Sequence, residues 1–393
     1  MTPQARVQAA IEILDLVIAA ARSGGAPADR IVGDWFRSRR FAGSGDRRAV
    51  RELVYGAVRA CGEIPETGRA AMLRVAAGDP TLTALFDGGR HAPALIAGDE
   101  VAAPAGIAPG WLESRLAESG IDGAEAQALL GRAPLDLRVN ALKADRDGIV
   151  LPITGETTVA PHGLRLPFGT PVEGWDVYRD GQIEVQDTGS QLTCEIVAAQ
   201  PGETVVDLCA GAGGKTLALA ADMKARGALL ASDTDRARLS RLAPRADRAG
   251  AAFIETMLLD PGREAEGLAE WQGRADAVLV DAPCSGTGTW RRNPEARWRL
   301  TERELARLAG VQARLLDLAS ALVRPGGRLV YVTCSLLDAE GADQAAAFLA
   351  RMPAWRAEDI SFAGLRKRGA GIRLTPHRDG TDGFFVARFR APC

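Results

Sequence analysis

Residues 204–220 read TVVDLCAGAGGKTLALA, an apolar run followed by a glycine-rich turn and a helix-forming segment. In a doubly wound α/β sheet, the first turn after a strand is where a nucleotide-like ligand binds, because glycine lets backbone N–H groups approach it. The stretch therefore predicts a ligand-binding strand–turn–helix unit, and its residue order discriminates between three kinds of ligand.

Two common nucleotide-binding motifs each differ from this turn at one position. A phosphate-binding P-loop ends in G-K-[ST], as residues 214–216 do, but its first glycine would fall on Cys209. A dinucleotide fingerprint fits Gly211 and Gly213, but its third glycine would fall on Thr216. Neither ATP nor NAD is therefore the expected ligand.

The third ligand, S-adenosylmethionine, fits the acidic residues around the turn. Its fold carries one acidic residue at the end of the first strand and another after the second, where Asp207 and Asp233 stand. A carboxylate at the second place can accept hydrogen bonds from ribose hydroxyls. We expect S-adenosylmethionine as the cofactor, with a glycine turn that serves only tight packing as the alternative.

Short apolar runs alternate with helix-period segments around this turn. The runs are TVVDL (204–208), ALLAS (228–232), AVLVD (277–281) and RLVYVT (328–333), and FFVARF (384–389) is a last strand. Such alternation predicts a parallel, doubly wound sheet. Pro244 falls inside a predicted helix and should end or kink it. In segment 302–323, one helix side is marked by Leu305, Leu308, Gln312, Leu315, Leu316, Ala319 and Leu322.

The chain before residue 186 divides into two further regions. Residues 1–133 are predicted to be helical, because Val7, Ile11, Leu14 and Ile18 recur at helical spacing. Residues 134–185 are rich in turns and short β-like runs that begin with the strand LDLRVNAL (135–142). The expected organisation is thus a helical domain over 1–133 and an α/β domain over 134–393, with an extension over 134–185 and a core over 186–393.

Composition indicates a soluble globular protein. Of its 393 residues, 48 are Lys or Arg and 50 are Asp or Glu, a net charge of −2 that removes the simplest argument for a nucleic-acid partner. Three histidines without metal-binding spacing predict no metal site. No stretch resembles a signal peptide or membrane span, and the scattered cysteines are typical of a reduced cytoplasmic protein. They are Cys61, Cys194, Cys209, Cys284, Cys334 and Cys393.

Two of these cysteines stand just beyond the ends of predicted strands. Cys284 lies in DAPCS (281–285) and Cys334 in TCS (333–335). A single buried cysteine is commonly inert core. Two cysteines at the carboxyl ends of strands, where ligands bind in an open α/β sheet, indicate a catalytic role instead.

The chain resembles the RsmB/NOL1/NOP2/Sun family of RNA cytosine-C-5 methyltransferases. The resemblance implies a class I methyltransferase (Rossmann-like) core, a small RNA-recognition-like extension at 134–185, and a NusB-like RNA-binding domain at 1–133, as in the bacterial rRNA branch. The motifs that carry it are EVQDTGSQL (184–192), CAGAGGKT (209–216), DAPCSGTG (281–288), RRNPEARW (291–298), VRPGGRLVYVTCS (323–335) and LTPHRDGTDGFFVARF (374–389).

The resemblance also implies a covalent mechanism. Carbon 5 of cytosine is too weakly nucleophilic to take a methyl group unaided, and a thiolate that adds to carbon 6 makes it an enamine. By the resemblance, Cys334 is this nucleophile, Cys284 helps to resolve the adduct, and Asp281 hydrogen-bonds the cytosine edge. A DNA-type mechanism would instead make Cys284 the nucleophile, but the second cysteine argues for the RNA class.

The resemblance assigns cofactor binding to the glycine turn and to three acidic residues beyond it. One departure is that the family usually has Ala-Ala-Pro where this chain has Ala210-Gly211-Ala212. The loss of proline leaves the backbone donors in place. The expected cofactor-binding residues are Cys209, Ala210, Gly211, Ala212, Gly213, Gly214, Lys215, Asp233, Asp260 and Asp281.

RNA is the expected partner, because a base must leave its stack to reach such a site and RNA loops offer splayed bases. The NusB-like domain favours rRNA over tRNA, and we expect a monomer. A ribosome-assembly factor without catalysis is the third hypothesis, against which the intact thiols argue. Two basic segments are predicted to contact RNA: Arg291, Arg292, Arg297, Trp298 and Arg299, and the run LRKRGAGIR (Leu365 to Arg373).

Overall fold

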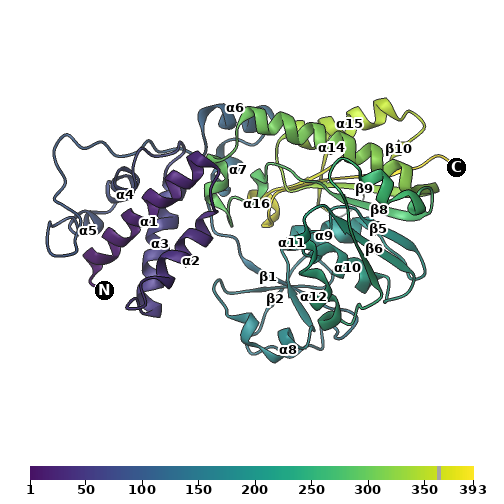
Figure 1. The fold of residues 1–393 in the computed structure, drawn as a ribbon, viewed down its shortest axis with the longest axis horizontal. Coiled ribbons are helices and arrows are strands. Elements are labelled where there is room, and N and C mark those ends of the chain that lie inside the picture. Colours follow the sequence, from purple (N-terminus) through teal and green to yellow (C-terminus); the bar gives the residue numbers. More distant parts are fainter. Residues whose placement is uncertain (361–363) are drawn as a thin grey trace. The chain divides into compact units, whose positions relative to one another are not determined.

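Two units make up the chain, and each of them is built from two separate segments. The computed structural model describes residues 1–360 and 364–393. The first unit joins Met1–Gly131 to Thr289–Thr301, and the second joins Arg132–Gly288 to Glu302–Cys393 (Figure 1). The segment Thr289–Thr301 follows the catalytic motif in sequence, and no sequence pattern indicated that it belongs with the N-terminal helices.

The first unit is helical, as predicted. The helical side predicted for residues 7–18 is buried, with Val7 and Leu14 fully inaccessible to solvent. Gly68 lets two helices approach closely, because a Cβ there would lie 2.3 Å from the carbonyl oxygen of Ile11. The helices are α1 (Pro3–Ser23), α2 (Ala28–Arg37), α3 (Ser44–Ala60), α4 (Gly68–Ala76), α5 (Pro80–Thr83), α6 (Gly110–Glu118) and α7 (Gly123–Ala128), with the 3-10 helix η4 (Pro294–Trp298).

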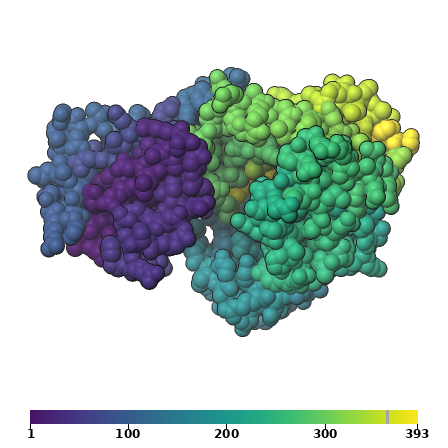
Figure 2. Space-filling model, in the orientation of Figure 1, coloured from purple at the N-terminus to yellow at the C-terminus, as the bar shows by residue number. Residues whose placement is uncertain are grey.

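A small antiparallel sheet begins the second unit. Its order is β2-β3-β1-β4, formed by β1 (Leu135–Val139), β2 (Glu156–Thr157), β3 (Gly163–Leu166) and β4 (Ile183–Val185). Glu184 on β4 pairs with Arg245 at 2.9 Å and also with Arg248, both on α12 (Leu242–Ala249) of the core. In Figure 2 the small sheet's residues form the blue-to-teal part that adjoins the green core of this unit.

The larger sheet has nine strands within the described residues and is mixed. Its order is β11-β12-β13-β9-β8-β5-β6-β7, with β10 against β13. The strands β5 (Thr204–Asp207), β6 (Ala228–Asp233), β7 (Ile254–Leu258), β8 (Ala275–Asp281) and β9 (Val323–Thr333) are parallel. The strands β10 (Arg356–Ala357), β11 (Arg366–Arg368), β12 (Gly371–Leu374) and β13 (Phe384–Arg390) pair antiparallel.

The prediction of parallel strands is therefore correct for β5, β6, β8 and β9, whereas β7 matches no predicted run and the predicted last strand, β13, pairs antiparallel. Parallel neighbours need a crossover of about a dozen residues or more, whereas antiparallel neighbours can follow each other closely. Only residues 375–383, with the four-residue helix α16 (Pro376–Asp379), join β12 to β13. This connection is too short for a crossover.

Helices cover both faces of the larger sheet. On one face, α9 (Thr188–Val197), α10 (Gly214–Asp222) and α12 share a core with Val205 of β5. On the other, α14 (Glu302–Leu322) and α15 (Ala342–Arg351) pack with the next residue, Val206. The side of α14 predicted from spacing is the buried side. None of the helices in the described ranges is long and apolar enough to cross a bilayer.

Pro244 interrupts its helical segment as predicted. The short helix α11 (Arg236–Leu239) ends before it, and α12 begins at Leu242, so that Pro244 lies in the first turn of the new helix. A proline is tolerated there, because the first N–H groups of a helix have no intrahelical acceptor.

Candidate active site

Neighbouring parallel strands end at one edge of the larger sheet and bring the predicted site residues together. The strands β9, β8, β5 and β6 lie in that order, and ligands bind at this carboxyl edge in open α/β sheets. A cavity of about 410 Å³ lies there. Five predicted site residues line it: Cys209, Asp233, Asp281, Cys284 and Cys334.

The two predicted catalytic thiols lie side by side. Cys284 follows β8 and Cys334 follows β9, and their Sγ atoms are 3.4 Å apart. The hydrogen bond with Cys334, together with burial, raises the pKa of the Cys284 thiol well above its ordinary value. Cys284 therefore keeps its proton at neutral pH and can donate it in a hydrogen bond to Cys334.

A buried carboxylate that sequence reasoning missed supports the loops that carry the thiols. The side chain of Glu340 accepts from the backbone N–H of Ser285 at 2.9 Å and also from the Ser285 hydroxyl. Gln312 on α14 donates to the same carboxylate at 3.0 Å and to the Pro283 carbonyl oxygen at 3.0 Å. The one sequence signal for Glu340 is its position, six residues after Cys334.

Lys215 and Asp281 form an ion pair beside the thiols. The Lys215 Nζ lies 2.7 Å from an Asp281 carboxylate oxygen. Burial acts against the charged amine, but the charge of Asp281, its hydrogen bond and smaller effects of nearby groups together raise the pKa of Lys215. The lysine of a P-loop reaches the ligand's phosphates instead. This contact therefore favours a ligand without a phosphate at the turn.

The cavity residues fit S-adenosylmethionine. Both carboxylate oxygens of Asp233 accept backbone N–H groups, one from Gly211 and one from Asp235, each at 2.7 Å. This fixes the carboxylate at the cavity wall, where its remaining lone pairs can accept from ribose hydroxyls. Leu208, Leu259, Pro283 and Leu315 supply apolar surface for an adenine ring.

The acidic residue at the end of β5 is buried behind this wall. Thr216 on α10 donates its hydroxyl to Asp207 Oδ2 at 2.7 Å, and the other oxygen, Oδ1, has no hydrogen-bond partner among the described residues. Burial raises the pKa of Asp207 to about 7, against the effect of the Thr216 hydrogen bond. Asp207 thus joins strand to helix and does not line the cavity.

The glycine turn adopts a backbone that requires glycine at two places. Gly211 and Gly213 have φ angles of +55° and +85°. A Cβ on Gly213 would lie 2.0 Å from Leu242 Cδ1. The turn residues Ala210 to Lys215 are not among the cavity-lining residues, so their cofactor contacts stay predictions.

Asp260 is another predicted cofactor residue that does not line the cavity. Its side chain is exposed, and Leu259 lines the cavity in its place. Its contact with the cofactor stays a prediction.

The expectation that Arg297 and Trp298 face RNA is wrong. Both are buried in the first unit, with Arg297 fully inaccessible. The Arg297 guanidinium donates to the carbonyl oxygens of Val58 at 2.6 Å, Cys61 at 2.9 Å and Pro294 at 2.5 Å, and Trp298 Nε1 donates to Cys61. Arg299 likewise donates to the Ala26 carbonyl oxygen at 2.7 Å. These side chains hold Thr289–Thr301 against the N-terminal helices.

The second basic run is also largely engaged within the protein. Arg368 on β11 and Arg373 on β12 both pair with Asp338, and Lys367 lies 3.2 Å from Asp359. Arg373 is 7% exposed. The expectation of a free basic face is therefore wrong for Arg373, whereas Lys367 is exposed and its contact with RNA stays a prediction.

Comparison with known proteins identifies the family of the chain. Residues 194–390 match the family model for the 16S rRNA methyltransferase RsmB/F. The Ribosomal RNA small subunit methyltransferase B of Xylella fastidiosa is 39% identical over 293 residues, which cover 71% of this chain and 68% of that protein. Its counterpart in Citrobacter koseri is 35% identical, over 71% and 65%. The chain thus spans about two thirds of the length of these curated relatives.

Solved structures agree with this assignment. The crystal structure of PH0851 is 25% identical, with a TM-score of 0.75 over 99% of both chains. NSun6 from Pyrococcus horikoshii, solved with SFG, shares the fold at 19% identity, with a TM-score of 0.61 over 71% of this chain and 97% of that one. The chain belongs to the 16S rRNA methyltransferase RsmB/F family, and it is an S-adenosylmethionine-dependent enzyme that methylates carbon 5 of cytosine in rRNA.

Proposed function

We propose that the chain methylates a cytosine of 16S rRNA through a covalent adduct in which Cys334 is the nucleophile. The observation that carries the assignment is the thiol pair, with Sγ atoms 3.4 Å apart and the pKa of Cys284 raised by its hydrogen bond to Cys334. A protonated Cys284 thiol can donate a hydrogen bond to the Cys334 sulfur when that sulfur leaves carbon 6.

The bonds change in a fixed order in this scheme. The Sγ of Cys334 bonds to carbon 6 of the cytosine, and carbon 5 becomes nucleophilic. When bound, S-adenosylmethionine would supply the methyl group that carbon 5 takes, and S-adenosylhomocysteine would be released. A base removes the carbon-5 proton, the bond between Sγ and carbon 6 breaks, and Cys334 leaves as a thiolate. Cys284 assists this last step by donating a hydrogen bond to the departing sulfur.

Asp281 is placed to orient the base. It ends β8, three residues before Cys284, and lines the same cavity as both thiols. One oxygen of its side chain lies 2.7 Å from the Lys215 Nζ, and the other can accept a hydrogen bond. In the proposed complex this carboxylate accepts a hydrogen bond from the exocyclic amino group of the cytosine.

Single substitutions distinguish the roles of the two thiols. Cys334→Ala should abolish methylation and leave no covalent RNA–protein species. Cys284→Ala should still attack and methylate but release RNA slowly, so that a complex resistant to denaturant accumulates as a shifted band on a denaturing gel. Cys393→Ala, which removes an exposed thiol outside the site, is the matched control and should behave like the parent. A trapped complex with Cys334→Ala would assign the nucleophile to Cys284.

The RNA target is tested separately from the chemistry. The relatives are named as small-subunit rRNA methyltransferases, which supports 16S rRNA over tRNA. Bisulfite sequencing of total RNA from a strain that lacks this chain should show one lost 5-methylcytosine in 16S rRNA. Loss of a 5-methylcytosine from a tRNA would identify tRNA as the substrate. If no RNA loses a 5-methylcytosine, the chain would be a non-catalytic assembly factor.

A further inference from the structure

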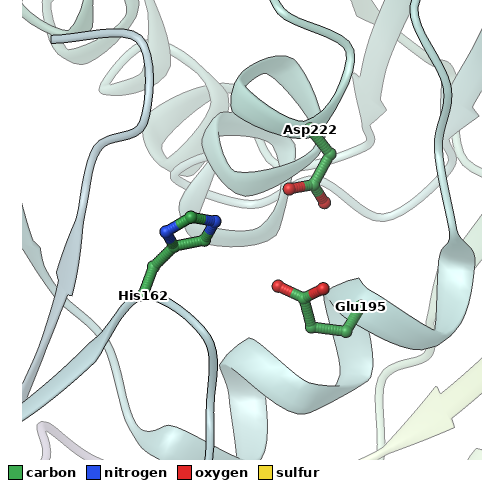
Figure 3. Close-up of side chains that lie close together, drawn as sticks. All are labelled: His162, Glu195 and Asp222. Carbon is green, nitrogen blue, oxygen red and sulfur yellow. The ribbon is translucent and has the colours of Figure 1, made fainter. Parts of the chain in front are cut away.

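Away from the cavity, three potential metal ligands meet from separate segments of the second unit. His162 precedes β3 of the small sheet, Glu195 lies on α9, and Asp222 is the last residue of α10. Figure 3 shows their side chains directed toward one another. One imidazole nitrogen and two carboxylate oxygens all lie within 4.8 Å of each other, and each side chain is half-buried. Within the described ranges, this is the one group of three or more such ligands.

The surrounding protein leaves these side chains without polar partners. Apart from their backbone groups, none of the three forms a hydrogen bond or ion pair with another residue in the described part of the chain. The charged group that acts on all three is the buried guanidinium of Arg138, which donates to Gln186 Oε1 at 2.7 Å. Two adjacent, half-buried carboxylates without a bonded partner are costly, and a bound cation would offset that cost.

We propose that His162, Glu195 and Asp222 form a binding site for a divalent transition-metal ion of the zinc class. Zinc accepts imidazole nitrogen and carboxylate oxygen together, whereas magnesium prefers oxygen ligands alone and retains water. Zinc–ligand bonds are about 2.0–2.2 Å long, so three ligand atoms on one ion lie at most about 3.8 Å from one another. Ligand atoms that lie as far apart as 4.8 Å must therefore close by about 1 Å when the ion binds.

Local electrostatics support the choice of these ligands. Asp222 ends α10, and the C-terminal end of a helix favours a cation. Burial, together with the charge of Glu195, raises the pKa of Asp222 to about 7, and a bound cation would counteract this. Burial also lowers the pKa of His162, which keeps the imidazole neutral and able to coordinate. The positive charge of Arg138 opposes binding and limits the affinity.

The ion would bridge two parts of the second unit. His162 belongs to the connection between β2 and β3, whereas α9 and α10 belong to the core, and α10 begins at the glycine turn. The site lies at the opposite end of α10 from that turn, so we assign it a positioning role. No short-spacing motif marks it, because its three ligands are far apart in the sequence.

The test measures zinc uptake and melting temperature of the full chain, free of any affinity tag. Cys284→Ala and Cys334→Ala are introduced first, so that the catalytic thiols bind no metal. After treatment with EDTA and its removal, one zinc per chain should remain after gel filtration with added Zn²⁺, and the melting temperature should rise. Adding Glu195→Gln and Asp222→Asn should weaken zinc binding by at least about tenfold.

The melting temperatures of the zinc-free and zinc-bound proteins should shift in opposite directions when Glu195→Gln and Asp222→Asn are introduced. Without zinc, the Gln/Asn variant should melt at or above the parent, because it removes two adjacent unpaired carboxylates. With zinc it should melt below the parent, a reversal that a purely structural role would not produce. His91→Ala with Glu255→Gln is the matched control and should keep full zinc uptake. A parent that retains no zinc, or uptake that survives Glu195→Gln and Asp222→Asn, would refute the site, and an equal response to Mg²⁺ would refute the metal class.

Discussion

Lys215 is buried, and Asp281, 2.7 Å away, holds its amine within the protein. In a phosphate-binding loop, the corresponding lysine reaches the ligand's phosphates. Here the amine also lies 5.6 Å from the centre of the Phe384 ring, so its position is fixed from two sides. Glycine-rich turns that both contain a lysine can thus bind different ligands, depending on which group the lysine contacts.

Asp233 provides the first test of this ligand assignment. Asp233→Asn should weaken S-adenosylmethionine binding by about 10- to 100-fold, because hydrogen bonds to a charged acceptor contribute about 1.5–3 kcal/mol each. Calorimetry with S-adenosylmethionine, ATP and NAD measures this, and only the first should bind to the parent. Asp247→Asn, an exposed position on α12, is the control. Tight ATP or NAD binding that disappears in Asp233→Asn would overturn the assignment.

Asp207 predicts a pH dependence of stability. Its folded-state pKa of about 7 lies above the ordinary value near 3.8, so the folded state favours the protonated form. The resulting stabilisation is complete below about pH 4 and is lost as pH rises through about 7. Asp207→Asn, which stays neutral, should melt like the parent at pH 4 and above it at pH 8. A difference in melting temperature that does not change with pH would contradict this.

The buried Arg297 side chain stabilises the packing of the 3-10 helix η4 within the first unit. Arg297→Ala would leave the carbonyl oxygens of Val58, Cys61 and Pro294 without this donor. The Cys61 carbonyl keeps its hydrogen bond from Trp298, so the expected loss is at least about 2 kcal/mol, because each of the other two acceptors left unpaired costs about 1–3 kcal/mol. Urea unfolding of the full chain measures it. Arg48→Ala on the exposed side of α3 is the control, and equal midpoints for the two variants would contradict the role of Arg297.

These elements also show what the sequence could predict. The buried side of α14 and the positions of Cys284 and Cys334 at strand ends followed from local spacing. The burial of Arg297 did not, because two of the carbonyl groups that bind it, those of Val58 and Cys61, lie more than 200 positions away in the sequence. The edge strand β7 has no buried residue and therefore no apolar run to reveal it. Local patterns report periodicity, whereas polar partners distant in sequence emerge only in the folded chain.

The return of Thr289–Thr301 to the first unit changes how that unit can be studied. Deletion of residues up to 133 would remove the partners of Arg297 and Trp298 and expose the side chains that they bury. A truncated chain would therefore report misfolding along with any loss of RNA affinity. Surface substitutions within the intact chain avoid this problem.

A second cavity, on the first unit, is the place where such substitutions should act on RNA binding. Its volume is about 450 Å³, and it is lined by Trp35, Arg39, Phe41 and Arg90, among others. Phe41 is 73% exposed, and the Arg39 guanidinium lies 4.1 Å from the centre of the Trp35 ring. The exposed Phe41 ring beside arginines suits a stacked base and its phosphates.

Salt dependence distinguishes these arginines from residues that only stabilise the fold. Each phosphate contact on a single strand contributes about −0.7 to the slope of log affinity against log salt. We expect Arg39→Ala with Arg90→Ala to flatten that slope by about 1.4 and to raise KM with kcat unchanged, because neither residue lines the catalytic cavity. Arg30→Ala with Arg48→Ala, also exposed in the first unit, is the matched control. An unchanged slope in the Arg39 and Arg90 variant would mean that this face of the helical unit does not bind the substrate RNA.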